Sequence, residues 1–266
     1  MNIAVVGHIE WGTFFRVAHL PTVGESVYAK ESWQEVCGGG SVAALQAAAL
    51  NGTCTFFTAI GSDEASKRSV EQLESNGVKV YATVHDELQT KSYIHIDDNR
   101  DRTITVVERF KPTGTDSALP WEKLAEMDAV YFVSGDERAL TLARQAKIVV
   151  STARVSALLN AVGVPIDVVV TSVKDNLEVY KDGDISPRPG AVVTTNGVHG
   201  GRVDDDTTYS AEVVPPEKIV DFYGCGDSFA AGLTYGLGMG YALPEALQVA
   251  AHAGAMAAQR RGAFGN

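Results

Sequence analysis

The chain contains 266 residues and has a mass of 28.2 kDa, which is enough to bury a sizeable apolar core in one large α/β domain, with or without a small appendage. Hydrophobic residues make up 45% of the chain and charged residues 21%, a composition typical of globular rather than disordered proteins. The 22 basic and 33 acidic residues give a net charge of −11, which argues against nucleic acid or an anionic membrane as the main partner, because both require a basic face.

The three cysteines, Cys37, Cys54 and Cys225, do not show the spacing of metal ligands. Their low and odd number predicts reduced thiols in a cytoplasmic protein. The first residues lead directly into a strand-like segment, so we expect no secretory signal. No apolar run approaches the ~18 residues of a membrane span.

Short apolar runs alternate with longer segments of helical period, a pattern typical of parallel strands joined by crossover helices. Buried strands are predicted at residues 2–7, 53–60, 129–133, 148–151, 167–171 and 191–195. Helices are predicted at residues 41–50, 64–76, 137–145, 156–162, 226–238 and 244–261. The sequence therefore predicts an α/β fold with a central, mostly parallel sheet flanked by helices.

Two segments, residues 13–36 and 78–107, instead alternate polar and apolar residues as strands do when one of their faces is solvated. Turn residues occur within them at 21–24 and 98–101. We expect these segments to form a small β-sheet inserted in a single domain that spans residues 1–266. Such a sheet is either a lid over a cleft or an edge elaboration that does not move.

A glycine-rich turn opens the helix predicted at 226–238, in the segment Asp221-Phe222-Tyr223-Gly224-Cys225-Gly226-Asp227. Gly224 and Gly226 allow close approach to the backbone, and successive N–H groups at the positive end of the helix dipole can hold a phosphate. Asp227 is then either a first-turn carboxylate that stabilises the helix or the group that accepts the proton of an attacking hydroxyl. Spacing alone leaves both roles open.

This segment resembles the C-terminal signature of the ribokinase-like, or PfkB, carbohydrate kinases, Asp-Thr-x-Gly-Ala-Gly-Asp followed by a helix. Asp221, Gly224, Gly226 and Asp227 match the signature, and the small Cys225 takes the place of Ala. The resemblance implies a ribokinase-like three-layer sandwich with a β-sheet lid. It further implies that Asp227 is the catalytic base and that the Gly224, Cys225 and Gly226 amides form an anion hole. Asp221 corresponds to a family position that holds a monovalent cation, K⁺ being the candidate.

Other segments resemble the family pattern in the same order, so that the similarity covers nearly the whole chain. Gly38, Gly39 and Gly40, before an alanine-rich helix, resemble the N-terminal signature and imply contacts with the substrate. Residues 59–63 look like the Gly-x-Asp turn that follows it.

The expected nucleotide site is assembled from two further segments. Thr195, Gly197 and Gly200 are similar to the Thr-x-Gly-x-x-Gly loop that approaches the phosphates of ATP, although a strand-ending turn also explains the pattern. Residues 250–263 resemble the terminal helix beside the adenine, which makes His252 a candidate contact; without the resemblance they are simply a tightly packed helix.

The chain departs from the family on the sugar side. Gly12 stands where sugar kinases commonly carry an Asp that binds hydroxyls, and Ala43 stands at the position of an Asn. His8 and Glu10 lie near the first of these positions at a strand end and can bind hydroxyls instead. The alternative for His8 is a buried histidine whose hydrogen bonds are satisfied within the protein.

The magnesium-ordering stretch of the family, Asn-x-x-Glu, aligns with residues 172–175, where Ser172 and Asp175 occupy its ends. Asp175 keeps a carboxylate that is one methylene shorter, and Mg²⁺ needs few direct protein ligands. Asp175 is therefore a candidate metal residue and Ser172 a candidate nucleotide contact. A surface Asp at a helix start is the alternative for Asp175.

Four basic side chains of the small sheet are candidates to reach the substrate: Lys91, His95, Arg102 and Arg109. Arg102 and Arg109 could neutralise an anionic substrate, with Arg102 the preferred candidate. Basic residues are also common on a solvated strand face.

The leading hypothesis is an ATP- and Mg²⁺-dependent kinase that phosphorylates a hydroxyl of a small molecule, with a sugar favoured and a nucleoside or other alcohol as alternatives. A non-catalytic descendant that binds a nucleotide or metabolite is the competing hypothesis. A homodimer formed through the small sheet is a further hypothesis. A dinucleotide-dependent dehydrogenase is disfavoured, because residues 7–12 lack the glycine spacing of a pyrophosphate-binding turn.

Overall fold

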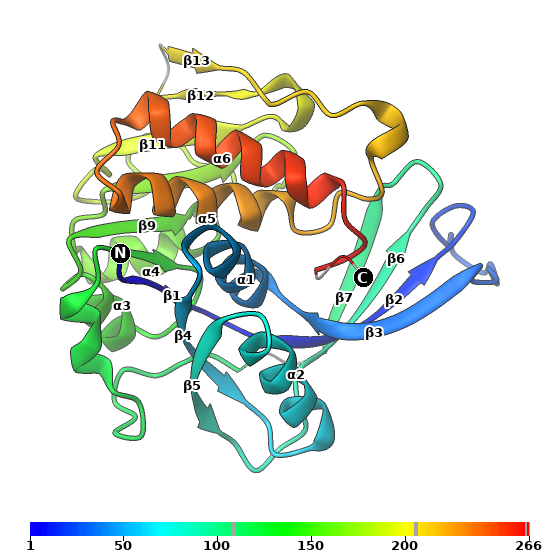
Figure 1. Cartoon of the computed structure of the whole chain (residues 1–266), viewed down its shortest axis with the longest axis horizontal. Coiled ribbons are helices and arrows are strands. Elements are labelled where there is room, and N and C mark those ends of the chain that lie inside the picture. Colours follow the sequence, from blue (N-terminus) through cyan, green and yellow to red (C-terminus); the bar gives the residue numbers. More distant parts are fainter. Residues whose placement is uncertain (108–109, 205–206, 264, 266) are drawn as a thin grey trace.

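A computed structural model describes residues 1–107, 110–204, 207–263 and 265 of the chain. Its main sheet has nine strands in the order β13-β12-β11-β10-β9-β8-β1-β4-β5 (Figure 1). The strands from β5 to β11 are parallel, and β12 and β13 continue the sheet antiparallel. Their bounds are β1 Ile3–Val6, β4 Cys54–Ile60, β5 Val78–Val84, β8 Ala129–Phe132, β9 Ile148–Thr152, β10 Val168–Ser172, β11 Ala191–Thr195, β12 Gly201–Val203 and β13 Thr207–Tyr209.

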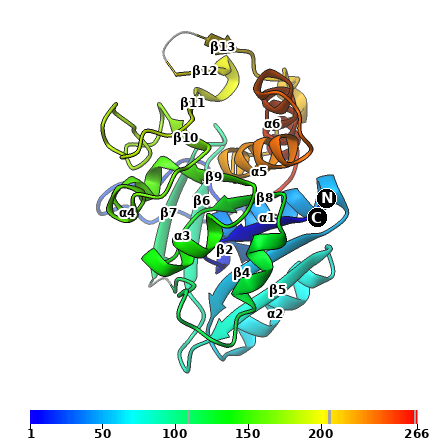
Figure 2. The same cartoon turned by 90° about the vertical axis from the view of Figure 1, so that its left-hand side faces the viewer.

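Helices cover both faces of this sheet, and the two layers are separated in the side view (Figure 2). On one face lie α1 (Gly39–Asn51), α2 (Glu64–Glu74), α5 (Cys225–Gly238) and α6 (Leu243–Ala258). On the other lie α3 (Glu137–Ala143), α4 (Ser156–Val162) and the 3₁₀ turn η1 (Trp121–Glu126). Shorter 3₁₀ turns are η2 (Ala153–Val155), η3 (Gly197–His199) and η4 (Pro216–Lys218). The predicted α/β fold with a mostly parallel sheet is confirmed.

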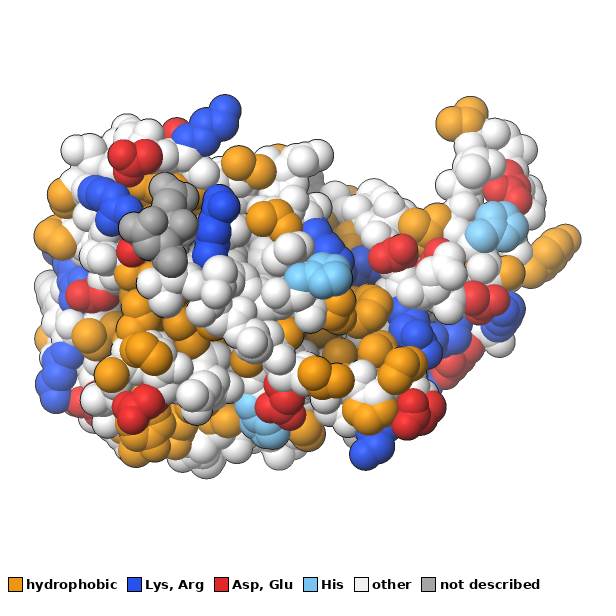
Figure 3. Space-filling model, turned by 90° about the horizontal axis from the view of Figure 1, so that it is seen from above, with side chains coloured by type: hydrophobic (Ala, Val, Ile, Leu, Met, Phe, Trp, Pro, Cys, Tyr) orange, Lys and Arg blue, Asp and Glu red, His pale blue; other side chains and the backbone are white. Residues whose placement is uncertain are grey.

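A separate four-stranded sheet, called the small sheet below, has the order β3-β2-β6-β7. It consists of β2 (Glu10–Arg16), β3 (Glu31–Cys37), β6 (Lys91–Ile96) and β7 (Arg102–Val107). β2 pairs antiparallel with β3 and parallel with β6, and β6 pairs antiparallel with β7. Seen from above, the small sheet projects from the body, and a hollow separates its tip from the main domain (Figure 3).

One boundary of the expected small sheet was wrong. Residues 78–84 form β5, which pairs in parallel with β4 at the edge of the main sheet, so the second segment of the small sheet begins at Lys91 rather than at 78. An edge strand of a large sheet is also solvated on one side, and its alternation of polar and apolar residues is the same as that of a lid strand. The short pair β12 and β13 is not among the predicted strands.

The inner face of the small sheet packs on the segment that leads into α5. Phe14, Ile94 and Ile96 are completely buried there, together with Tyr223 and Ala263. The Phe14 ring meets the Tyr223 ring edge-on, with centroids 5.0 Å apart. Burial of this apolar cluster fixes the small sheet directly beside the glycine-rich turn.

Within the described residues, no helix has both the length and the apolar character needed to cross a membrane. The thiols of Cys37, Cys54 and Cys225 are unbridged, as expected for reduced cysteines.

Candidate active site

The candidate active site lies where the carboxyl ends of β1, β8, β10 and β11 meet the N-termini of α1 and α5. Two contacts show this convergence: His8, after β1, lies 3.1 Å from Ser134, after β8, and Gly39 at the start of α1 lies against Asp227 at the start of α5. Ligands of α/β sheets bind at such strand ends, because loops and helix N-termini gather there.

The N-terminus of α5 contributes its first backbone amides to this region. Gly224 precedes the helix in the left-handed conformation, with φ of 71°, and a Cβ there would lie 2.8 Å from Val42 Cγ1, so glycine is required. The first backbone bond of the helix runs from Ser228 N to Gly224 O, so the amides of Cys225, Gly226 and Asp227 precede it and belong to the part of a helix that can bind an anion. A Cβ on Gly226 would meet no described atom within 4 Å, so there is space beside Gly226 itself.

Cys225 contributes its amide rather than a charge to this turn. Burial raises the pKa of its thiol to about 11, so the thiol is neutral at pH 7. A neutral sulfur beside the amides leaves their attraction for an anion undiminished.

The Asp227 carboxylate is close-packed against α1. A Cβ on Gly39 would lie 2.7 Å from Asp227 Oδ1, so only glycine allows this approach. The pKa of Asp227 is raised to about 6, mainly by burial and in part by the negative charge of Glu178, while Arg102 and Arg154 oppose the shift. A carboxylate with a pKa near neutrality is suited to general base catalysis, since it is ionised at pH 7 and still basic enough to accept a proton.

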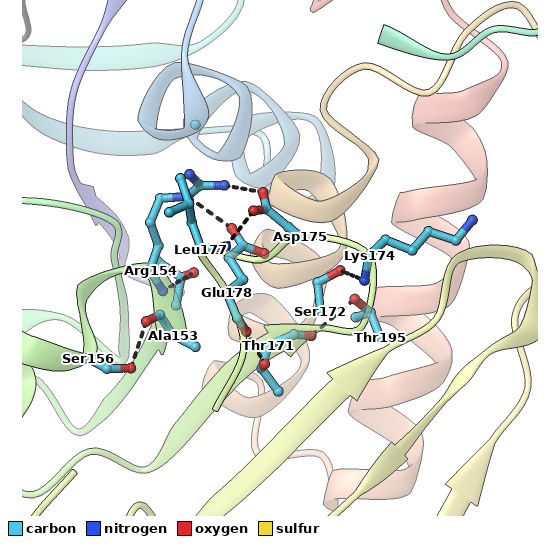
Figure 4. Close-up of polar contacts among 12 residues, drawn as sticks. Ala153, Arg154, Ser156, Thr171, Ser172, Lys174, Asp175, Leu177, Glu178 and Thr195 are labelled. Carbon is cyan, nitrogen blue, oxygen red and sulfur yellow. Dashed lines mark hydrogen bonds and ion pairs between the residues drawn. The ribbon is translucent and has the colours of Figure 1, made fainter. Parts of the chain in front are cut away.

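Arg154 gathers two further acidic side chains at the end of β10 (Figure 4). Its Nη2 forms an ion pair with Asp175, and its Nε donates to Glu178 Oε1 at 3.2 Å. Asp175 also accepts a bond of 2.9 Å from Leu177 N, so both of its oxygens are engaged. Burial raises the pKa of Glu178, and Glu178 rather than Asp175 exerts the stronger influence on Asp227. The metal role expected for Asp175 stays a prediction, and Glu178 joins it as a candidate.

His8 occupies the floor of the site on the side of β1. Its Nε2 accepts a bond of 3.2 Å from the Gly39 amide, and its Nδ1 lies 3.1 Å from Ser134 Oγ. Glu10 Oε1 lies 3.5 Å from the same Nε2. His8 is thus both a buried, hydrogen-bonded residue and a neighbour of the Gly38–Gly40 segment.

Glu10, the first residue of β2, is buried next to the glycines that open α1. Ser92 Oγ donates to the Glu10 carboxylate. A Cβ on Gly38 would lie 3.0 Å from Glu10 Cγ. The negative charge of Glu10 raises the pKa of Asp227. Because Gly38 and Gly39 are consecutive, Glu10 and Asp227 flank one peptide group.

The positions of the missing family residues are filled by packing. A Cβ on Gly12 would lie 2.6 Å from Cys37 Sγ and 2.8 Å from Phe14 Cε2, so the position has no room for an aspartate. Ala43 is completely buried in the apolar core. Gly40 allows α1 to approach β1, since a Cβ there would lie 2.5 Å from the His8 carbonyl oxygen.

The expected nucleotide loop follows β11. Gly197 and Gly200 both have positive φ, 55° and 78°, as a tight turn requires. Thr195 Oγ1 donates to a main-chain carbonyl of β10 at 3.1 Å, and Ser172 Oγ accepts from Lys174 N at 3.2 Å (Figure 4). Lys174 Nζ would lie 3.2 Å from a Cβ on Gly197, so its ammonium group stands at the loop.

His252 lies on the exposed side of α6. Its Nδ1 is 2.8 Å from Glu212 Oε2, a contact that orients the ring from the segment between β13 and α5. The structure leaves its expected contact with adenine as a prediction.

The small sheet separates its basic residues onto two faces. Arg102 pairs in register with Ile96, whose side chain is buried on the inner face. The positive charge of Arg102 lowers the pKa of Asp227. Lys91 and His95 alternate with the buried residues of β6 and lie on the outer face, where His95 stacks on Phe15 at 5.1 Å. Arg102 is therefore the basic candidate that the fold directs at the site, whereas Arg109 lies outside the described residues.

Asp221 is completely buried beside the glycine-rich turn. Its Oδ1 accepts a bond of 2.9 Å from Tyr223 N, and its Oδ2 accepts one of 3.1 Å from Gly262 N. Burial raises the pKa of its carboxyl group. The carboxylate thus ties the turn before α5 to the C-terminal segment.

No group of three or more His, Cys, Asp or Glu side chains suited to hold a metal occurs in the described ranges. This arrangement is compatible with Mg²⁺ that is held mainly by phosphates and water, with one or two carboxylates beside it.

Comparison with protein families decides the identity of the chain, because the model of the pfkB family carbohydrate kinases matches residues 1–265. The chain belongs to this family. Kinases of this family are phosphotransferases.

Individual relatives agree with the family assignment. A ribokinase of Dictyostelium discoideum is 30% identical over 110 residues, a match that spans 40% of this chain and only 34% of that protein. The ribokinase of Thermotoga maritima superposes with a TM-score of 0.78 at 19% identity, over 99% of this chain and 94% of the other. The ribokinase of Cryptococcus neoformans var. grubii serotype A, in complex with ADP, also gives 0.78 at 19% identity, over 99% and 95%. At these identities the structural matches show the fold.

Three polar residues of this pfkB kinase site were missed by the sequence analysis: Arg154, Lys174 and Glu178. Glu178 lies three residues beyond Asp175, and a search for a displaced acidic residue after β10 would have found it. Arg154 follows a different strand, so its position beside Glu178 depends on the pairing of β9 with β10.

Proposed function

We propose that this pfkB family member transfers the γ-phosphoryl group of ATP to a hydroxyl group of a small sugar, with Asp227 as the catalytic base. The observation that carries the proposal is the Asp227 carboxylate, with a pKa of about 6, in the first turn of α5 beside the first backbone amides of that helix. A helix that only needed stabilisation would be served by an exposed carboxylate with an ordinary pKa.

In the proposed reaction the acceptor hydroxyl oxygen attacks the γ-phosphorus while its proton passes to Asp227. A new P–O bond forms, the bond between the γ-phosphorus and the β–γ bridging oxygen breaks, and ADP leaves with that electron pair. The amides of Gly224, Cys225 and Gly226, expected to form the anion hole, together with that of Asp227, stabilise the charge on the transferring group, because all four precede the first amide that donates a helical hydrogen bond, that of Ser228.

The acidic residues fit a magnesium ion that is bound together with the nucleotide. Glu178, with Asp175 behind it, would stand beside the ion, which supplies neutralisation of the phosphate charge. Arg154 holds both carboxylates in place, and Lys174 offers a positive charge at the Gly197 loop for the phosphate chain.

Thr195, Gly200 and Ser172 would complete the nucleotide site, with His252 beside the adenine. This assignment is supported by the glycine geometry of the loop and by the family membership. The ADP in the Cryptococcus ribokinase is consistent with it.

The acceptor site is proposed between Asp227 and the pair His8 and Glu10. Gly38 and Gly39 form its wall, since both glycines admit these side chains at close range. Glu10 can accept hydrogen bonds from sugar hydroxyls, replacing the aspartate for which position 12 has no room. Arg102 closes the site from the small sheet, where it can neutralise the transferring phosphoryl group or an acidic substituent of the acceptor.

The test is acceptor-dependent release of ADP from Mg-ATP by the purified protein, across pentoses, hexoses, sugar phosphates, nucleosides and other alcohols. Phosphorylation of a sugar that disappears in Asp227→Asn supports the proposal. If a nucleoside were the sole acceptor, the substrate class would be nucleosides rather than sugars. Nucleotide-induced thermal stabilisation with no turnover on any acceptor would favour a binding protein instead.

A further inference from the structure

The family resemblance assigns a monovalent cation to Asp221, and the residues around this carboxylate do not fit one. A bound K⁺ needs oxygen atoms with lone pairs directed at it. Each carboxylate oxygen of Asp221 already accepts one backbone bond, from Tyr223 N and from Gly262 N, which leaves one lone pair on each. The third neighbour is the guanidinium of Arg16, whose Nη2 lies 3.9 Å from Asp221 Oδ2.

The charge around Asp221 is already compensated by arginines. Arg16 and Arg102 both act on the Asp221 carboxylate as positive charges, and Arg260 interacts with Asp221 and Glu35. These guanidinium groups supply positive charge beside the Asp221 and Glu35 carboxylates. An additional cation at Asp221 would be repelled by them, and this repulsion is strong in a buried site.

Arg16 has a second acidic neighbour besides Asp221. It is the last residue of β2 and pairs in register with Glu31 of β3. Its Nε lies 3.8 Å from Glu31 Oε2, and Glu31 also forms an ion pair with Arg261. The Arg261 guanidinium is positioned over the Trp33 ring, 4.7 Å from its centroid. The Arg16 guanidinium thus lies between two carboxylates, Glu31 at 3.8 Å and Asp221 at 3.9 Å.

We propose that the Arg16 guanidinium, together with the Tyr223 and Gly262 amides, takes the place of the monovalent cation at Asp221, so that this protein needs no K⁺. Arg16 is then a positioning residue: it orders the turn from Asp221 to Asp227 through Asp221. Since Arg16 belongs to the small sheet, the charge that orders the catalytic turn is supplied by the element that covers the site.

The first experiment compares the wild-type protein in chloride salts of K⁺, Na⁺ and tetramethylammonium at equal ionic strength. Thermal unfolding with and without ADP, and the Kd for ADP, are the readouts, and neither requires the acceptor. The proposal predicts equal Tm and equal Kd in the three salts. A higher Tm or tighter ADP binding that is specific to K⁺ would overturn it.

The second experiment uses Arg16→Gln, with Arg138→Gln on the exposed surface of α3 as the matched control. Arg16→Gln should lower the Tm by several degrees and weaken ADP binding about tenfold in tetramethylammonium, because a buried carboxylate loses its partner. Potassium should restore part of both losses. The same losses in both salts would show a merely structural contact and overturn the proposal, as would a variant indistinguishable from Arg138→Gln.

A double variant, Arg16→Gln with Asp221→Asn, covers the case in which Arg16→Gln does not fold. Removing the carboxylate together with its partner should recover stability relative to Arg16→Gln alone, and should abolish any response to K⁺. No recovery would overturn the proposed pairing. Failure of the proposed kinase reaction would leave these readouts unaffected, because they measure folding and nucleotide binding only.

Discussion

Asp227→Asn separates the two roles of the carboxylate that opens α5. The variant keeps the shape of the side chain and removes its ability to accept a proton. General base catalysis contributes about 10²–10⁴-fold to a rate, so kcat should fall by that factor, equivalent to ~3–5 kcal/mol in the activation free energy. Binding of ATP should change little, since the amides of the helix N-terminus remain.

The Asp227 pKa of about 6 also predicts how kcat and the stability of the folded protein change with pH. About one tenth of Asp227 is ionised at pH 5 and about nine tenths at pH 7, so wild-type kcat should rise roughly tenfold between them. Because the folded-state pKa lies above the ordinary value of 3.8, ionisation of Asp227 destabilises the folded protein, progressively as pH rises from 3.8 to about 6. With allowance for partial exposure, Asp227→Asn should be about 1–3 kcal/mol more stable at pH 7, and the gain should vanish below pH 3.8.

The assay is initial-rate ADP release against pH, combined with thermal unfolding at the same pH values. Glu245→Gln is the matched control, because Glu245 is a first-turn carboxylate of the neighbouring helix α6 and bonds the Ala242 amide. Its activity should equal that of the wild type. Wild-type turnover by Asp227→Asn, or a kcat that stays level between pH 5 and 7, would refute the assignment of the base.

Three other substitutions probe the surroundings of this residue. Gly226→Val should leave the Tm close to that of the wild type, because a Cβ there meets no described atom within 4 Å. It should reduce phosphoryl transfer by about 10²-fold or more, because the valine side chain fills the anion site. Unaltered turnover would contradict an anion hole at this turn. Glu178→Gln should shift the acid limb of the kcat–pH profile below pH 6, since the Glu178 charge raises the pKa of Asp227, and an unmoved limb would show that the two carboxylates do not interact. Gly12→Ala should lower the free energy of unfolding by ~1–3 kcal/mol in denaturant unfolding, because the added Cβ would lie 2.6 Å from Cys37 Sγ. A smaller loss in a Cys37→Ala background would identify the clash. Equal stability of Gly12→Ala and the wild type would refute it.

Close approach explains why the glycine motifs could be located from sequence while their partners could not. Gly39 and Gly224 stand out in the sequence as members of glycine-rich turns. Only the packing of α1 on α5 shows that Gly39 admits the Asp227 carboxylate and that Gly224 admits Val42. A glycine marks a place where something comes near, and the approaching group is set by the tertiary fold.

The strand register decided which candidates of the small sheet face the site. Alternation along β6 and β7 directs Lys91 and His95 outward and Arg102 inward, and this assignment depends on which face packs on Tyr223. Sequence alternation separates two faces and does not name the buried one, because both contain apolar residues. Residues 78–84 illustrate the same limit, since the alternating pattern of an edge strand is shared by both sheets.

The sequence by itself determined the parallel α/β architecture, the position of the helices and the glycine-rich turn that opens α5, because periodicity and glycine spacing are local properties of the chain. The tertiary structure alone decided the electrostatics of the site. Burial of Asp227 beside Glu178 sets its pKa, and pairing across the chain brings Arg154 to Glu178 and Arg16 to Asp221. Charge interactions fall off over a few ångströms, so residues far apart in sequence determine them only once the fold has placed them together.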